Sequence, residues 1–360
     1  LVRAWALHRL GREAAALASL RKAMSMDVAG APPARLELMA IFDWARQALP
    51  RSGRPDFLAG SLMVGRRRLD EGVAAWNAAA RKGEKHWLLF ASLGFYHARV
   101  AKDRKAALAW FRKAEKANPK DLYVKDEIAA LLAADSPAQA ARYLERRMDA
   151  VKASPKLAHG LLSAYLKMRQ YRRFDALCGE LDFRHNHQLP GPHLLWPARH
   201  LQEAVLLLKA GKPRRALALL EVIEKPCPPH LGRQFAFQLE HDRRLYHAGR
   251  CYEKLGQMDK ARACWEQAAA LPHYTGFEPA YWVREWTKRY YQALCLGKLG
   301  RESEANAFFD AMELLAQTPA LPQSARQAVL DLVERGRFAP DDEKDPVMKA
   351  AVVVATRAEE

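Results

Sequence analysis

The sequence has little that would support a disulfide framework, a metal site or a membrane span. Its five cysteines form no Cys-x-x-Cys pair, and an odd number cannot all pair within one chain. The apolar stretch from Met348 to Ala355 is far shorter than the roughly 20 residues that cross a bilayer. We therefore expect free, mostly buried thiols, no cofactor, no membrane partner and a cytoplasmic location.

The sequence also lacks the common catalytic signatures. It contains no Gly-x-Gly-x-x-Gly, no P-loop, no His-Glu-x-x-His and no Gly-x-Ser-x-Gly. His185, His187, His193 and His200 gather near Cys178, but their spacing matches no standard metal site. We expect that this chain is not an enzyme and holds no metal.

Negative charge is scarce in the first half of the chain. The formal net charge is +17, and residues 1–180 hold 33 Lys and Arg against 18 Asp and Glu, whereas residues 181–360 hold 25 against 23. A basic surface attracts nucleic acid, anionic lipid or an acidic protein, and solvated helix faces would also account for it. The arginine runs are 66–68, 146–147, 172–173, 214–215 and 243–244.

Strand patterns are missing too, so the composition favours helices. Half of the residues are apolar, and Ala, Leu and Arg are frequent. These residues have high helix propensity, and no segment shows the alternation of β-branched and aromatic residues that a sheet needs. The expected fold class is therefore all-α.

A recurring pattern of small and large residues predicts paired helices. Its clearest copy consists of Gly249, Tyr252, Gly256, Ala261, Trp265 and Ala268. Gly249 allows two helices to approach closely, and Gly256 ends the first helix in the left-handed conformation that glycine adopts most easily. Ala261, Trp265 and Ala268 lie at i, i+4 and i+7, which is one face of the second helix.

The same spacing occurs elsewhere in the chain. It is found at Ala293, Leu296, Gly300, Ala305, Phe309 and Met312, at Ala204, Leu207, Gly211, Ala216, Leu220 and Ile223, and at Ala4, Leu7, Gly11, Ala16, Leu20 and Ala23. A copy with one extra residue in its turn contains Gly94, Ala107, Phe111 and Ala114, and weaker signals lie at 72–79 and 137–180. Several copies with one spacing indicate a helical-repeat array.

These residues resemble the tetratricopeptide repeat over roughly residues 4–335. The resemblance implies an α-solenoid of helical hairpins. We expect a basic N-terminal repeat segment over 1–180, an irregular Pro/His-rich loop over 181–200, repeats over 201–338 and a tail over 339–360. Because Leu1 lies inside a helical pattern without a capping residue, we expect that the chain continues upstream.

The order of features also resembles the C-terminal region of large uncharacterised bacterial proteins. In that family a β-rich, carbohydrate-enzyme-like region precedes the tetratricopeptide repeats. The residues that carry the resemblance are 57–62, 74–76, the copy at 93–114, and an aromatic and histidine loop at 183–187. The Gly- and Glu-rich part of that loop is absent here, and Trp196 follows only after an insertion, so a function tied to the loop does not carry over.

The pattern predicts a non-catalytic binding or assembly scaffold. In tetratricopeptide repeats the first helices line a concave groove. Here that placement gives the residues Arg243, Tyr246, Arg250, Lys254, Trp286 and Tyr290, a set suited to an acidic peptide, a carboxyl terminus or a glycan. Two alternatives stay open: an accessory region of a larger carbohydrate-active enzyme, and a solenoid that binds nucleic acid through its basic half.

Overall fold

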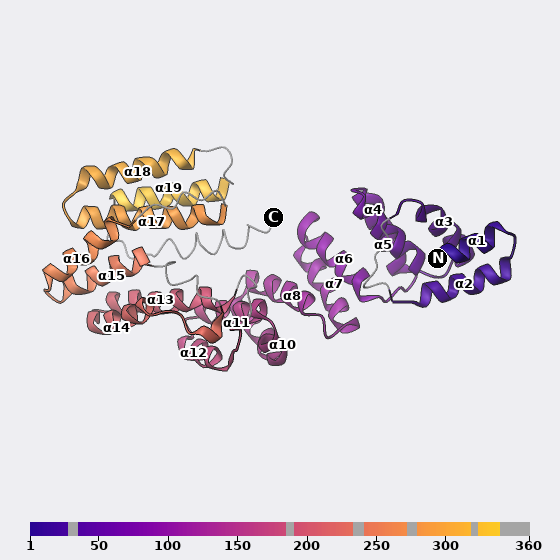
Figure 1. The fold of residues 1–360 in the computed structure, drawn as a ribbon, viewed down its shortest axis with the longest axis horizontal. Coiled ribbons are helices and arrows are strands. Elements are labelled where there is room, and N and C mark those ends of the chain that lie inside the picture. Colours follow the sequence, from indigo (N-terminus) through magenta and orange to yellow (C-terminus); the bar gives the residue numbers. More distant parts are fainter. Residues whose placement is uncertain (28–34, 185–190, 233–240, 272–278, 318–322, 339–360) are drawn as a thin grey trace. The chain divides into compact units, whose positions relative to one another are not determined.

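The chain folds into helices joined by short turns (Figure 1). The computed structural model describes residues 1–27, 35–184, 191–232, 241–271, 279–317 and 323–338. Helices account for most of these residues, and no strand occurs among them. The predicted all-α solenoid of tetratricopeptide-like helical hairpins is confirmed.

The chain divides into two compact units, residues 1–150 and residues 151–360. The division falls inside α10 (Met148–Ala153). The irregular loop expected at 181–200 belongs to the second unit. Within that loop, residues 192–194 form a 3-10 turn and α13 begins at Leu195. Pro197 fits there because the first turn of a helix has no partner for its N–H groups.

The described residues of the first unit form four helical hairpins and one extra helix. Within each hairpin, one helix packs against the next in chain order, and α3 packs against α4. The helices are α1 (Val2–Arg9), α2 (Glu13–Ser25), α3 (Leu38–Ala48), α4 (Arg54–Gly65), α5 (Leu69–Arg81), α6 (Trp87–Phe95) with a π-helical end (Tyr96–Val100), α7 (Arg104–Ala117), α8 (Leu122–Asp135) and α9 (Pro137–Glu145).

In the second unit the described residues form four more hairpins and one further helix. Its helices are α11 (Pro155–Lys167), α12 (Tyr171–Glu180), α13 (Leu195–Lys209), α14 (Pro213–Glu224), α15 (His241–Lys254), α16 (Met258–Ala269), α17 (Pro279–Lys298), α18 (Glu302–Ala316) and α19 (Gln323–Phe338). The first helices of successive hairpins touch, α13 with α15 and α15 with α17. This stacking is the arrangement expected of a solenoid, in which each repeat contacts mainly its neighbours.

One turn geometry closes most of the hairpins. At the end of α15, the N–H of Gln257 donates to the carbonyl of Tyr252 at 2.9 Å and the N–H of Gly256 donates to that of Glu253 at 3.0 Å, which is a Schellman cap. Gly256 has φ of +73°. The same two bonds recur around Gly11, Gly211 and Gly300, and also around Arg67 and Arg169, whose φ values are +62° and +57°.

Aromatic side chains packed on glycines bring the two helices of a hairpin together. A Cβ added to Gly94 would lie 2.7 Å from the ring of Phe111, and one added to Gly60 would lie 2.6 Å from the ring of Trp76. Both rings are buried. Because a larger residue would collide with the ring, these glycines set the closeness of α6 to α7 and of α4 to α5.

No helix within the described ranges is both long enough and apolar enough to cross a membrane.

Candidate functional site

The hairpin of α15 and α16 is built around Trp265. The indole ring is 1% exposed and its N–H donates to the carbonyl oxygen of Tyr246 at 3.3 Å. It covers Gly249, where an added Cβ would lie 2.2 Å from the indole nitrogen. Ala261 and Ala268, one turn to either side of the ring, are fully buried. This packing fixes which face of α15 is turned towards α16.

A buried amide joins this hairpin to the next one. Gln292 of α17 is fully buried, and its Nε2 donates to the carbonyl oxygen of Leu271 at 2.8 Å, just beyond the end of α16. The last carbonyls of a helix have no partner within the helix. Nε2 of Gln292 also lies 3.4 Å from the carbonyl oxygens of Ala268 and Ala269 in the last turn of α16, so this amide donates to the carbonyl end of that helix.

Aromatic and cationic side chains of α15 and α17 meet on another face of α15. The rings of Tyr246 and Tyr291 are 5.4 Å apart, and the imidazole of His247 lies 5.8 Å from Tyr291. The guanidinium carbon of Arg243 lies 5.6 Å from the centre of the Tyr291 ring. Arg243 and Tyr246 are both buried, with 2% and 3% of their surface exposed. A guanidinium over an aromatic ring is held by a cation–π interaction.

Arg250 extends this face by one turn of α15. Its Nη1 donates to the hydroxyl oxygen of Tyr246 at 3.2 Å, and its Nε lies 3.3 Å from the carboxylate of Glu253. Lys298 of α17 reaches the same carboxylate at 3.4 Å. Lys254 is exposed to solvent. Charged groups thus gather where the aromatic part of the face ends.

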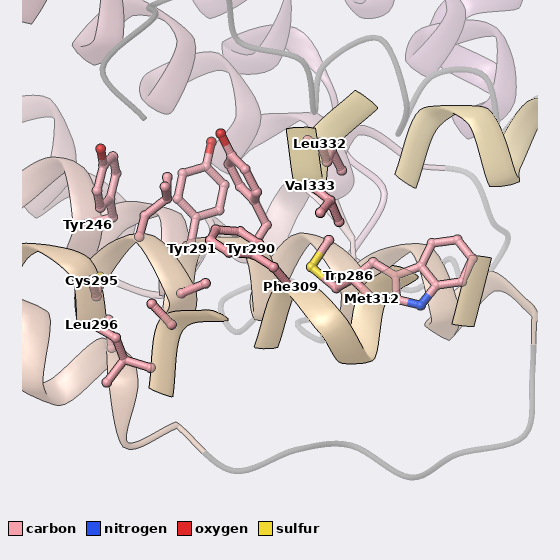
Figure 2. Packing of buried hydrophobic residues seen from close by; sticks show 14 of the residues in the cluster. Tyr246, Trp286, Tyr290, Tyr291, Cys295, Leu296, Phe309, Met312, Leu332 and Val333 are labelled. Carbon is pink, nitrogen blue, oxygen red and sulfur yellow. The ribbon is translucent and has the colours of Figure 1, made fainter. Parts of the chain in front are cut away.

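Trp286 and Tyr290 lie in the hydrophobic core of this region, each with 4% of its surface exposed. Tyr290 packs edge-on against Tyr291 and also contacts Phe309 of α18. Figure 2 shows the hydroxyl ends of Tyr246, Tyr290 and Tyr291 pointing to one side of the cluster. The sequence did not predict Tyr291 as a site residue. The repeat spacing aligns Tyr246 with Tyr290, whereas the ring that meets Tyr246 in the structure is that of the next residue, Tyr291.

The predicted packing residues of the other repeats occupy core or turn positions. Ala107, Phe111, Ala114, Ala204, Ala216, Ala305 and Phe309 are buried, whereas Tyr252 is partly exposed. Gly211, Gly256 and Gly300 hold the left-handed turns.

Burial keeps the thiols and a histidine of this region neutral. It raises the pKa of Cys251 to about 12 and raises that of Cys295 well above its usual range. Burial also lowers the pKa of His241, with the charge on Arg244 adding to the effect. Protonated thiols are poor nucleophiles, so the chemistry available here is binding through guanidinium, ammonium and phenol groups.

The histidines noted in the sequence do not assemble into a metal centre within the part of the chain that the structure describes. His185 and His187 lie outside the described residues. His193 and His200 are buried, and the Nδ1 of His200 lies 2.9 Å from the carbonyl oxygen of Trp196.

Comparison with known proteins matches one segment of the chain. Residues 242–272 match the family model described as the tetratricopeptide repeat. A search of curated proteins finds no match. The matched segment coincides with the hairpin of α15 and α16, including Gly249, Gly256 and Trp265. This hairpin therefore has the character of a tetratricopeptide repeat, a module typical of protein-interaction scaffolds.

Proposed function

We propose that the chain is a non-catalytic protein-binding scaffold, and that the face shared by α15 and α17 recognises an acidic peptide segment. The match to the tetratricopeptide repeat and the stacked hairpins support the first part of the proposal. The accessible residues of this face are Arg250 and Lys254, and the buried residues that support them are Arg243, Tyr246 and Tyr291.

The observation that carries the second part is the position of Arg250. Its guanidinium is held beside the Tyr246 hydroxyl, so part of the entropy cost of ordering it is already met before a ligand arrives. Its intrahelical pair with Glu253, at three residues' spacing, is a weak interaction that a ligand carboxylate can replace. Guanidinium and carboxylate then form charge-assisted hydrogen bonds next to an aromatic ring.

Arg243 contributes from below this surface. Because it is buried over the ring of Tyr291, it raises the positive potential of the face without itself being open to solvent. Removing its charge would also disturb the packing. Variants at the more accessible Arg250 and Lys254 are therefore the cleaner test.

The experiment selects ligands from a displayed library of random peptides on the immobilised chain. Selected peptides should be enriched in Asp and Glu. The double variant Arg250→Gln/Lys254→Gln should bind a selected acidic peptide at least tenfold more weakly than the native chain, since each lost charge-assisted contact contributes about 1.5–3 kcal/mol.

The matched control removes two exposed charges from the opposite helix of the same hairpin. Lys260→Gln/Arg262→Gln has the same change in net charge and leaves the sequence of α15 unchanged. If both double variants bind equally well, or if the selected peptides show no acidic enrichment, the α15–α17 face is not the site.

The resemblance to larger proteins with an upstream β-rich, carbohydrate-enzyme-like region stays a prediction. The coding sequence upstream of Leu1 tests it directly. A long β-rich reading frame would favour an accessory role in a carbohydrate-active enzyme, and a start codon a few residues away would exclude it.

A further inference from the structure

Helix α7 of the first unit carries a row of cations on its solvent face. Lys105, Arg112 and Lys116 are exposed and lie within an arc of about 40° on a 3.6-residue helix. Lys113 is exposed beside this row, and Lys120 lies in the turn between α7 and α8. At a rise of about 1.5 Å per residue, the row from Lys105 to Lys116 spans roughly 17 Å.

The row is positive along its whole length. Glu115 is the one carboxylate within α7, and it is already engaged. It accepts from the hydroxyl of Tyr143 on α9 at 2.8 Å and from Nε of Arg147, just beyond the end of α9, at 2.7 Å. Asp103 and Asp121, beyond the two ends of α7, cap α7 and α8. An ordinary solvated helix mixes the two signs, so this row is a source of net positive potential.

The aromatic rings nearby are partly buried and are in contact with other side chains. The ring of Trp110 stacks on that of Phe90 with 5.9 Å between their centres, and the ammonium of Lys113 lies 4.0 Å from the centre of the Trp110 ring. The guanidinium of Arg147 lies 3.8 Å from the Tyr143 ring. Between the cations the exposed face holds only small side chains such as that of Ala109.

This composition separates the possible partners. The cores of protein interfaces are enriched in aromatic residues and depleted of lysine, whereas phosphate contacts in nucleic-acid complexes come mainly from Arg and Lys. Proteins that bind single strands stack bases on open aromatic rings. Because Lys113 and Arg147 lie over the two nearby rings and the cations form a row, the α7 face suits the backbone of a duplex better than unpaired bases.

We propose that Lys105, Arg112, Lys113 and Lys116 form a site for the phosphate backbone of double-stranded nucleic acid. The site contacts the backbone and makes no contact with the bases. The site belongs to the first unit. It is independent of the peptide-binding face proposed for the second unit.

The test measures binding of a fluorescent DNA duplex, and of an RNA duplex of the same sequence, by anisotropy over a range of KCl concentrations. Each phosphate contact contributes about −0.9 to the slope of log Kobs against log salt, so four contacts give a slope near −4. The triple variant Lys105→Gln/Arg112→Gln/Lys116→Gln should lower the slope by about 3 and bind at least tenfold more weakly at 0.1 M salt. Whichever duplex binds more tightly identifies the form preferred.

The control removes the same charge from an exposed turn of the second unit. Lys209→Gln/Lys212→Gln/Arg214→Gln should retain the native slope. Far-ultraviolet circular dichroism and thermal unfolding should match the native chain for both triple variants, since glutamine keeps the helix propensity of these positions.

Several results would overturn the proposal. One is absence of binding to either duplex at 0.05 M salt, and another is an equal loss of affinity in the two triple variants. Binding to polyglutamate or to phosphatidylserine vesicles as tight as to the duplexes, with the same dependence on α7, would show that the row does not select nucleic acid.

Discussion

Replacing Gly249 by alanine tests the central contact of the α15–α16 hairpin. The new Cβ would lie 2.2, 2.6 and 2.7 Å from Nε1, Cδ1 and Cε2 of Trp265, all closer than real Cβ atoms come to other heavy atoms. The ring cannot move aside without cost, because it is 1% exposed and bonded to the Tyr246 carbonyl. Either the two helices separate or that hydrogen bond is lost.

Two opposing contributions to stability decide the sign of the effect: the higher helix propensity of alanine and the cost of overpacking. Alanine inside a helix is more favourable than glycine by about 1 kcal/mol. Overpacking a buried site costs about 1–3 kcal/mol, and losing the indole hydrogen bond costs about 1 kcal/mol more. We therefore expect Gly249→Ala to destabilise the hairpin by about 2 kcal/mol.

Urea unfolding, together with hydrogen exchange of peptides from α15 and α16, measures this change. Gly297→Ala is the control, because a Cβ there meets no atom within 4 Å, and it should leave stability unchanged or raise it by up to about 1 kcal/mol. In a Trp265→Ala background the penalty of Gly249→Ala should disappear. If it persists there, or if Gly249→Ala is as stable as Gly297→Ala, the contact with Trp265 does not control this position.

Three further predictions concern stability. Trp265→Ala should cost about 3–5 kcal/mol of unfolding free energy in urea, and a loss below about 1 kcal/mol would contradict full burial of the ring. Arg169→Gly should stabilise the second unit by about 0.5–1 kcal/mol, because Arg169 holds a left-handed conformation that glycine adopts without strain; a lower urea midpoint would refute this reasoning. Burial lowers the pKa of His159 to about 4, with charge on His193 and Lys167 adding to the effect, so the unfolded chain binds more protons below pH 6.5 and stability should fall from pH 6.5 towards pH 4. The His159 contribution is below about 3 kcal/mol since the ring keeps some exposure, and His159→Gln should lose less stability than the native chain between pH 7 and 4.5.

The repeats with a turn glycine gave the clearest pattern in the sequence. The hairpin of α6 and α7 has no turn glycine and was predicted from Gly94 and Phe111, whereas the hairpins that turn at Arg67 and Arg169 gave only weaker signals. Gly11, Gly211, Gly256 and Gly300 each mark a hairpin that the structure contains. Arg67 and Arg169 hold the same turn with the same two hydrogen bonds, yet nothing in their identity indicates it. An L-residue in this conformation costs only about 1–2 kcal/mol, so a packed array tolerates it.

In the candidate site, too, local sequence spacing predicts the position of some side chains and not of others. Local spacing places Tyr246 and Arg250 on one face of α15, and the structure joins them by a hydrogen bond. The burial of Tyr290 depends instead on Gly336 of α19, where an added Cβ would lie 3.0 Å from the Tyr290 ring and 2.5 Å from that of Phe309. No local pattern encodes the approach of a helix more than 40 residues away.

The amide of Gln292 has a consequence for how the end of the array folds. Its hydrogen bond to the carbonyl of Leu271 exists only when α17 is in place against α16. Opening α17 alone would leave that carbonyl without its donor, in addition to exposing the core that the two helices share. The two hairpins of α15–α18 should therefore open as one cooperative block, although a linear array of repeats permits each hairpin to fray separately.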